Sequence, residues 1–362
     1  MSDPPAWDDG WARVWAEAHG AGPAASLVPA RVVRIDKGGI TVADGAGADQ
    51  LVVAAKSARR VVVGDVVALD PAAGRIEAIL PRRTVFERRS PGADRDDVRL
   101  SARPVAANMD RVLVLQPLDA GVNLARLARE LVLAWESGAV PVVVLTKADL
   151  VDPATVEHER AEAARFAPGV EVVVASTRTA GGLGALGDQA GHGRVVALLG
   201  ASGAGKSSLA NALAGHRVAL VAEVREGDRR GRHTTTAGQM IGLADGGWLI
   251  DTPGIRGVGL WAADEGLERA FADLLPYAER CRFADCTHRS EPGCGIVAAV
   301  ADGEVAADRL EVWHRLIDEL EDLEAGLVGR DRELEREDNR RSRRRARGRD
   351  ERRDPDDGQE PS

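Results

Sequence analysis

The sequence has few aromatic residues, few cysteines and no long apolar run. Aromatic residues make up only 3% of the 362 residues, so Val, Leu and Ala must form the hydrophobic cores. No segment approaches the roughly 18 apolar residues that a membrane helix requires. The acidic N-terminus lacks the basic and then apolar pattern of a secretory signal. We therefore expect a cytoplasmic protein without membrane contact. The three cysteines, all between Cys281 and Cys294, are too few for a disulfide framework.

The chain as a whole is acidic, but two of its segments are basic. The net charge of −9 argues against a uniformly basic nucleic-acid-binding protein. Basic residues nevertheless outnumber acidic ones in residues 30–89 and in Arg340–Arg353. Such patches favour localised contact with a polyanion. The alternative is a solvated surface and, for the tail, a disordered charged segment.

The pattern of apolar residues divides the chain into several domains. Residues 27–90 contain five short strand-like runs, the strand count of an oligonucleotide-binding (OB) barrel, and end in a basic linker. Strands then alternate with helices, which indicates an α/β domain with a parallel sheet. We expect five parts: a poorly ordered or short helical leader (1–26), a small all-β OB-like barrel (27–90), the α/β domain (100–263), an α-helical domain (264–328) and a charged, Arg-rich disordered tail (329–362).

A phosphate-binding loop lies between a strand and a helix of the α/β domain. The stretch GASGAGKSS fits G-x-x-x-x-G-K-[ST], whose glycines let backbone N–H groups surround phosphates. Lys206 is expected to reach the β- and γ-phosphates, and Ser207 to bind Mg²⁺. The predicted loop residues are Gly200, Ala201, Ser202, Gly203, Ala204, Gly205, Lys206, Ser207 and Ser208.

A second motif, WLIDTPG, supplies the expected partners of this loop. Asp251 ends an apolar strand and is placed to hold the Mg²⁺ shell, while Gly254 can offer its N–H to the γ-phosphate. The preceding polar, Gly-rich stretch is typical of a loop that orders around γ-phosphate and Mg²⁺. We expect Thr235, or else Thr234 or Thr236, to be the second Mg²⁺ ligand; alternatively, these threonines simply begin the next strand.

The stretch VVVLTKADL resembles a guanine-reading motif at the end of a strand. Asp149 is expected to accept hydrogen bonds from guanine N1 and N2, donors that adenine does not offer together. Lys147 would lie along the base, and Thr146 and Ala148 complete the motif. Ser176 follows a second apolar strand, where its backbone N–H would face guanine O6.

The base-reading motif precedes the phosphate-binding loop, which reverses the usual order. Loops at one edge of a parallel sheet can form the same site when the chain is opened elsewhere, provided the old termini lie close together. The order of motifs therefore predicts a circularly permuted GTPase.

The cysteines lie in a metal-binding pattern. Cys281, Cys286, His288 and Cys294 provide three thiolates and one imidazole, the ligand set of a closed tetrahedral zinc site. We expect one structural Zn²⁺ that stabilises a loop-rich segment with little core of its own. The alternative is three reduced cysteines beside a surface histidine.

This combination of motifs resembles the ribosome small-subunit-dependent GTPase A family. The resemblance covers roughly residues 27–328 and depends on TKADL, GASGAGKSSLAN, GRHTTT, DTPGIR and the cysteine pattern. It implies Mg²⁺-dependent GTP hydrolysis stimulated by the small (30S) ribosomal subunit during its late maturation. It also implies a barrel and a zinc domain that contact ribosomal RNA. We expect the protein to be a monomer, with GTP, GDP and the small subunit as its partners.

The sequence departs from this pattern at Thr146, at Ser176-Thr177, where the family has Ser-Ala, and at Ile255; the key Lys147 and Asp149 are kept. Thr146 replaces the usual Asn, which is expected to remove some bracing hydrogen bonds. Ile255 follows DTPG, where Ras-like enzymes carry a water-orienting Gln. We therefore predict slow intrinsic hydrolysis, with the missing group supplied by the loop around His233, by Arg256 or by ribosomal RNA.

Three other functions remain compatible with the sequence. The protein could be a P-loop ATPase or kinase with a chance T-K-x-D, or an RNA-binding scaffold that holds nucleotide without turnover. It could also be a GTPase that acts on another RNA or on the large subunit.

Overall fold

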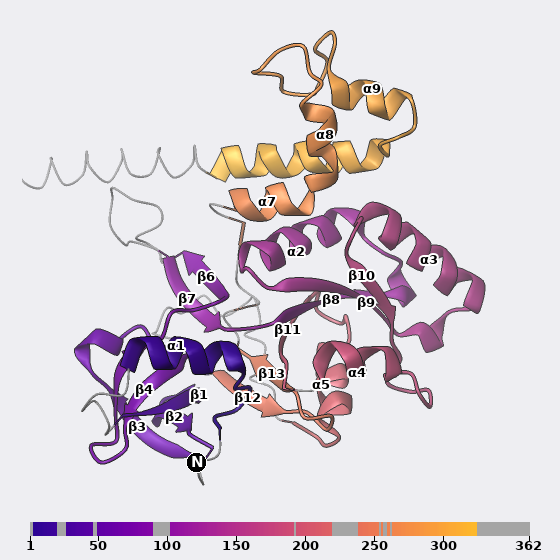
Figure 1. Cartoon of the computed structure of the whole chain (residues 1–362). Coiled ribbons are helices and arrows are strands. Elements are labelled where there is room, and N and C mark those ends of the chain that lie inside the picture. The colour runs from indigo at the N-terminus through magenta and orange to yellow at the C-terminus, as the bar shows by residue number, and fades with distance from the viewer. Residues whose placement is uncertain are drawn as a thin grey trace, which may run out of the picture.

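The structure is a computed structural model (Figure 1). It describes residues 3–19, 27–45, 49–89, 102–191, 193–218, 238–252, 255, 259–260 and 263–323. A β-barrel, an α/β layer and a group of C-terminal helices follow one another across the molecule. Among the described residues, no helix combines the length and the apolar character needed to cross a bilayer.

The five expected strands form a closed barrel. They are β1 (Val28–Asp36), β2 (Gly39–Ala43), β3 (Gln50–Ala54), β4 (Val66–Asp70) and β5 (Arg75–Ile79), with the short 3-10 helix η1 (Lys56–Ala58) after β3. Their order is β1-β2-β3-β5-β4, and β4 pairs back onto β1 to close the sheet. Alternate side chains such as Ala30 and Val32 point into the barrel core because side chains in a strand alternate between faces. The predicted OB-like barrel is confirmed.

The leader, expected to be either poorly ordered or a short helix, contains a helix. Helix α1 (Asp9–His19) covers the outside of the barrel, where Trp11 is buried against Val66 and Ala68 of β4. Asp8 caps the helix by accepting a hydrogen bond from the Trp11 N–H at 2.8 Å. Burial of one large aromatic side chain gives this short helix a fixed place that its Ala- and Gly-rich surroundings do not suggest.

The basic segment after the barrel, expected to be a turn-containing linker, contains a strand. It contains strand β6 (Val85–Arg89), which pairs antiparallel with β7 (Ala102–Ala107) in a separate two-stranded sheet. Phe86 is buried in the main core, so the hairpin connects the barrel to the α/β layer by packing as well as by covalent linkage.

The α/β layer is a six-stranded portion of a larger sheet. Its order is β10-β9-β8-β11-β13-β12, parallel except for the antiparallel edge strand β12, which also pairs with β1 of the barrel. The strands are β8 (Arg111–Pro117), β9 (Val140–Thr146), β10 (Glu171–Val174), β11 (Val195–Gly200), β12 (Gly238–Gly242) and β13 (Trp248–Asp251).

Helices cover both faces of this sheet, as is usual for a parallel sheet. Helices α2 (Leu124–Glu136) and α3 (Pro153–Phe166) pack on one face, while α4 (Gly184–Ala190) and α5 (Lys206–Ala214) pack on the other (Figure 1). Alternate residues of β8 divide between two cores, with Val112 and Val114 toward α2 and Leu113 and Leu115 toward α5.

The C-terminal helices lie on the α2 and α3 side of the sheet. They are α7 (Asp264–Ala270), the 3-10 helix η5 (Ala272–Leu274), α8 (Leu275–Ala278), α9 (Gly295–Ala301) and a helix over residues 307–323. Gly266 allows α7 to approach α2 closely, since a Cβ there would lie 2.3 Å from the Val132 carbonyl oxygen. The buried Arg309 donates hydrogen bonds to Asp273 and to the Phe166 carbonyl.

Candidate nucleotide site and metal centre

The strand ends of the α/β sheet bring the predicted nucleotide residues together. Parallel pairing aligns Gly200 at the end of β11 with Leu115 of β8, and Thr146 at the end of β9 with Pro117 of β8. Asp251 ends β13, the other neighbour of β11. The carboxyl ends of parallel strands are where α/β proteins bind ligands. One sheet edge therefore carries both the base-reading and the phosphate-binding motifs.

The phosphate-binding loop connects β11 to α5. Gly200 has φ +147° and Gly205 has φ +93°, values that favour glycine. A Cβ on Gly200 would also lie 3.0 Å from the Leu115 carbonyl oxygen. The Lys206 ammonium is buried and donates to the carbonyls of Gly200 and Ala201 at 2.7 and 2.6 Å, so the loop curves around this lysine. Ser207 and Ser208 are exposed in the first turn of α5.

Thr146 braces the phosphate-binding loop directly. Its hydroxyl donates a hydrogen bond of 2.8 Å to the carbonyl of Ala204, and both residues are buried. We expected the replacement of Asn by Thr to weaken such bracing, but the threonine makes this contact. The bond joins two segments 58 residues apart in the chain and so holds the base motif against the phosphate loop.

The rest of the base motif forms a tight turn at the sheet edge. Lys147 has φ +60°, and residues Ala148–Leu150 form the 3-10 helix η4 that carries the exposed Asp149. The Lys147 ammonium forms an ion pair of 2.8 Å with Asp119, which lies in the 3-10 helix η3 (Leu118–Ala120) just after β8. Sequence reasoning missed Asp119. Its position two residues after the end of the neighbouring parallel strand was the available signal.

Ser176 contacts the base motif in a different way from the one expected. Its backbone N–H donates to the carbonyl of Gly182 at 2.9 Å, so this N–H is not directed at a base. Its hydroxyl instead donates a 2.6 Å hydrogen bond to Asp149 Oδ1. Since the hydroxyl also accepts from the Arg178 N–H at 3.1 Å, Ser176 holds the Asp149 carboxylate in one orientation.

The predicted switch residues are only partly described by the structure. Asp251 is buried and lines a small cavity together with Lys206, Thr252 and Ile255. Ile255 is 3% exposed and packs in the main core. Thr235, with its alternatives Thr234 and Thr236, lies outside the described residues, as do His233, Gly254, Arg256 and the Arg-rich tail.

A buried carboxyl group lies close to the phosphate loop. Glu130 of α2 accepts a hydrogen bond of 2.8 Å from Gln116 of β8, and both side chains are buried. Burial raises the pKa of Glu130 to about 7, although the positive charges of Arg126 and Lys206 oppose this increase. The carboxyl is therefore partly protonated near neutral pH.

The four predicted metal ligands gather in one cluster after α8. One ligand atom from each of Cys281, Cys286, His288 and Cys294 lies within 4.8 Å of all the others. Cys281 Sγ is 3.9 Å from Cys294 Sγ and 3.3 Å from His288 Nδ1. Bond lengths of about 2.3 Å for Zn–S and about 2.0 Å for Zn–N in a tetrahedron require separations of about 3.8 and 3.5 Å. The cluster can therefore hold one metal ion.

Backbone N–H groups also favour thiolates in this cluster. The N–H of Gly295 points to Cys281 Sγ at 3.3 Å, and the N–H of Val297 to Cys294 Sγ at 3.5 Å at the start of α9. Donation of N–H groups to sulfur stabilises the negative charge that a metal-bound thiolate carries. The donor set of three sulfurs and one imidazole nitrogen suits zinc.

Comparisons with known proteins agree with this architecture. The family model described as RsgA GTPase matches residues 79–261. A Streptomyces coelicolor protein named small ribosomal subunit biogenesis GTPase RsgA is 44% identical over 317 residues, which cover 86% of this chain and 85% of that protein. Among solved structures, YjeQ from Thermotoga maritima is 26% identical with a TM-score of 0.62, covering 81% of this chain and 98% of the other.

A second solved structure bears on the order of the motifs. YloQ, described as a circularly permuted GTPase, has a TM-score of 0.59 and 23% identity, covering 82% of this chain and 96% of the other. At this identity the likeness speaks for the fold alone, and the fold is the permuted one expected here. Given the matched family model and the extent of the identity to the Streptomyces protein, this chain belongs to the RsgA GTPase family.

Proposed function

We propose that this protein is a cytoplasmic GTPase that binds the small ribosomal subunit during its late maturation and hydrolyses GTP when the subunit stimulates it. The observation that carries the proposal is the meeting of Asp149 and the Gly200–Lys206 loop at one sheet edge, held together by the Thr146 hydrogen bond. The names of the relatives support the choice of the small subunit.

Guanine selection is assigned to Asp149. Both carboxylate oxygens can accept, one from guanine N1–H and one from the N2 amino group, and Ser176 fixes the carboxylate for this purpose. Adenine presents no such pair of donors, so ATP would leave the carboxylate unpaired. The Lys147 side chain, held by Asp119, lies along the base in this assignment.

Phosphate binding is assigned to the loop that surrounds Lys206. A bound triphosphate would replace the carbonyls of Gly200 and Ala201 as the partner of the ammonium group. The oxygen donors Ser207 and Asp251 suit Mg²⁺, which neutralises charge on the phosphates when it is bound. Thr235 and Gly254 complete the proposed site, and zinc is the proposed metal of the cysteine cluster.

Slow hydrolysis without the ribosome follows from Ile255. The residue directly after DTPG is apolar and buried, so it has no group that can orient an attacking water. A polar group from His233, Arg256 or ribosomal RNA must do so, and activators that supply such a group raise GTPase rates by up to about 10⁵-fold.

The decisive experiment measures GTP turnover by the protein alone, with isolated small subunits and with isolated large subunits. Lys206→Ala serves as the blank, and excess ATP is added as a competitor. We expect strong stimulation by small subunits only and no inhibition by ATP. Turnover that neither subunit changes, or that large subunits stimulate equally, would contradict the proposal.

A further inference from the structure

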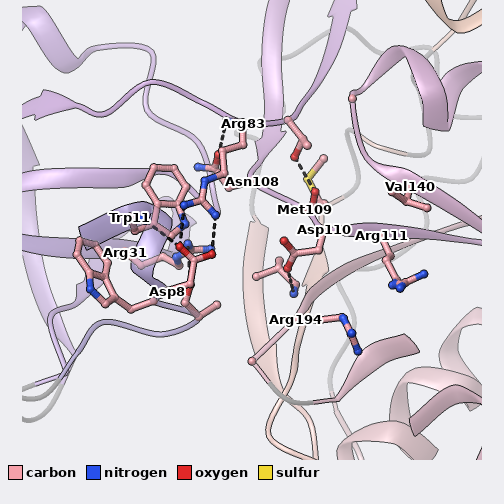
Figure 2. A pocket seen from close by; sticks show the side chains of 16 residues that line it. Asp8, Trp11, Arg31, Arg83, Asn108, Met109, Asp110, Arg111, Val140 and Arg194 are labelled. Carbon is pink, nitrogen blue, oxygen red and sulfur yellow. Dashed lines mark hydrogen bonds and ion pairs between the residues drawn. The ribbon is translucent and has the colours of Figure 1, made fainter. Parts of the chain in front are cut away.

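A pocket of about 550 Å³ lies at the edge of the sheet opposite the nucleotide site. Its walls come from helix α1, from the barrel and from the amino-terminal ends of β8, β9 and β11 (Figure 2). The starting residues of these strands, Arg111, Val140 and Val195, all line it. Nothing in the proposed GTPase mechanism uses this pocket.

Arg31 is a buried cation on the wall of this pocket. Its side chain is 1% exposed, and its Nη2 donates a long hydrogen bond of 3.3 Å to the Ala6 carbonyl. Its Nε and Nη1 have no hydrogen-bond partner, and no carboxylate in the described part of the chain forms an ion pair with it. Burial lowers the pKa of Arg31 to about 10. The Arg31 guanidinium also lies 5.7 Å from the centre of the Trp11 ring and feels the negative charges of Asp110 and Asp8, but none of these groups accepts a hydrogen bond from Nε or Nη1. Buried donors without an acceptor are costly, so this arginine points to a ligand.

The pocket carries an excess of positive charge. Arg31 and Arg83 lie on the barrel side, and Arg111 and Arg194 lie on the side of the α/β layer (Figure 2). Among the described residues that line the same pocket, only Asp8 and Asp110 carry carboxylates. The excess of two charges suits a dianion, and arginine side chains recognise phosphate oxygens through paired N–H groups.

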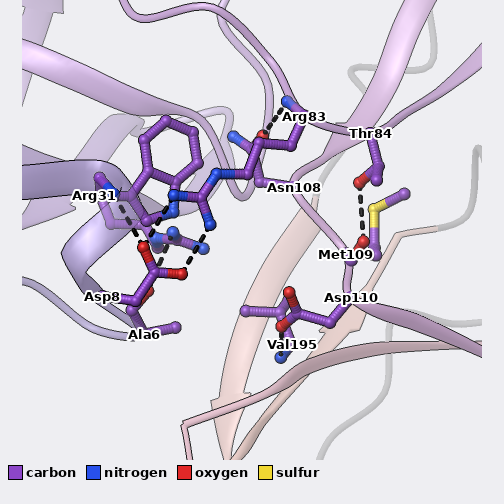
Figure 3. Close-up of polar contacts among 10 residues, drawn as sticks. Ala6, Asp8, Arg31, Arg83, Thr84, Asn108, Met109, Asp110 and Val195 are labelled. Atoms are coloured by element: carbon purple, nitrogen blue, oxygen red, sulfur yellow. Dashed lines mark hydrogen bonds and ion pairs between the residues drawn. The ribbon is translucent and has the colours of Figure 1, made fainter. Parts of the chain in front are cut away.

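In the structure, Asp8 lies beside Arg31 and Arg83, the two arginines on the barrel side of the pocket (Figure 3). Its carboxylate pairs with both terminal nitrogens of Arg83 at 2.6 and 2.7 Å, and Arg83 stacks on the Trp11 ring at 4.0 Å. The Asp8 and Arg83 side chains are 53% and 35% exposed, so the pair is open to solvent and to an incoming anion. A dianion carries more charge than the Asp8 carboxylate and can therefore compete with it for Arg83 and reach Arg31 behind it.

We propose that this pocket binds a terminal phosphate group, a phosphate monoester or inorganic phosphate, between Arg31 and Arg83, with Asp8 as the internal carboxylate that it displaces. A terminal phosphate fits better than an internal phosphodiester because it carries nearly two negative charges at neutral pH and can enter end-on. Binding there would link the leader helix and the barrel to the α/β layer.

The test is calorimetric titration of the full chain saturated with Mg²⁺ and a non-hydrolysable GTP analogue, so that the nucleotide site is filled. The probes are inorganic phosphate, adenosine 5′-monophosphate, uncharged adenosine, and one short oligoribonucleotide with and without a 5′-phosphate. We expect the phosphate-bearing small molecules to bind and adenosine not to bind. If, in addition, the 5′-phosphorylated oligonucleotide binds and the unphosphorylated one does not, an RNA end can be the source of the same group.

Two variants with opposite expected effects make the test specific. Arg31→Met keeps the volume of the side chain and should weaken phosphate binding at least tenfold. Asp8→Asn keeps the helix cap but removes the competing charge, so it should bind phosphate several-fold more tightly. Arg75 is an exposed barrel arginine outside the pocket, so Arg75→Met should leave the affinity for phosphate unchanged.

Three results would overturn the proposal. One is the absence of phosphate binding by the wild-type protein. Another is equal binding by the wild type and Asp8→Asn, which remains informative even if Arg31→Met does not fold. The third is binding of the oligoribonucleotide regardless of its terminal phosphate, which would assign the pocket to the RNA backbone.

Discussion

The α/β sheet and the cysteine segment are stabilised in opposite ways. In the sheet, central strand residues such as Leu113, Leu115 and Val144 are fully buried between two helical layers. In residues 281–294, Cys294 is the one buried residue, and most of the others are exposed. The nucleotide site therefore exists whenever the sheet folds, because its residues are strand ends. The cysteine segment depends instead on what its side chains bind.

The same contrast explains why one region accepts a permuted chain. Strand ends at one sheet edge form a site whichever strand comes first, provided the pairing β8-β11-β13 is kept. The short cysteine segment has no such freedom, because its ligands must follow one another within a few residues. Rearrangement of the chain thus preserves a site built from a sheet but would destroy one built from a local sequence.

The largest expected effect comes from removing the metal proposed for the cysteine cluster. We expect Cys286→Ser, or treatment with a chelator, to abolish hydrogen-exchange protection in residues 281–301 while β8, β9 and β11 stay protected. Structural zinc contributes on the order of 10 kcal/mol to the folding of small zinc domains, and this segment has little core to replace it. Metal content is measured in parallel.

Asp285 is exposed and directly precedes Cys286, so Asp285→Asn is the matched control. This variant should retain both the metal and the hydrogen-exchange protection of residues 281–301. If removal of the metal also exposed the sheet, the two regions would not be independent. If the segment stayed protected without metal, its stability would have another source.

A smaller effect concerns the buried carboxyl of the sheet region. The pKa of Glu130 is about 7 in the folded protein against an ordinary value of 4.5. Between these values the folded state holds a proton that the unfolded state has lost, so the free energy of unfolding falls as pH rises from 4.5 through 7. The fall amounts to about 3 kcal/mol in total.

Glu130→Gln should abolish this decline and be more stable than the wild type at pH 8, as measured by urea unfolding between pH 5 and pH 8. Glutamine can still accept the hydrogen bond from Gln116. Glu268→Gln, in an exposed helix position, should keep the wild-type slope. An equal slope in the wild type and Glu130→Gln would show that Glu130 is ionised in the folded protein.

The smallest effect tests the bond between the base motif and the phosphate loop. Thr146→Val keeps the shape of the side chain but leaves the Ala204 carbonyl without its donor, at a cost of about 1 kcal/mol. We expect GTP binding to weaken about fivefold. Thr146→Ser retains the hydroxyl and should bind GTP as the wild type does; equal weakening in both variants would mean that the hydroxyl bond to Ala204 is not the source of the effect.

Much of the fold could be predicted because its signals are local. The barrel strands and the strand before Gly200 are short apolar runs between turn residues, and the phosphate loop and cysteine ligands are fixed spacings. The strand β6 was missed because residues 90–101 separate it from its partner, so no short turn marks the pair. Helix α1 did have a signal, since Trp7, Trp11 and Trp15 follow helical spacing.

Side-chain partners across the sheet were the least predictable part of the site. The Thr146 bond to Ala204, the Lys147 pair with Asp119 and the Ser176 bond to Asp149 all join segments that are distant in sequence. A motif shows which residue types are present but not which neighbour takes up each donor. Ser176 illustrates this, because a nearby carbonyl engages the N–H that had been assigned to the base.

The central claim is that a permuted sheet edge reads guanine through Asp149, and an exchange of base specificity tests it most directly. Xanthine carries a carbonyl oxygen where guanine carries its N2 amino group. Asp149→Asn replaces an acceptor with a donor and should therefore bind xanthosine triphosphate better than GTP, whereas the wild type shows the reverse order. If Asp149→Asn still preferred GTP, or if the wild type bound both nucleotides equally, Asp149 would not be the residue that reads the base.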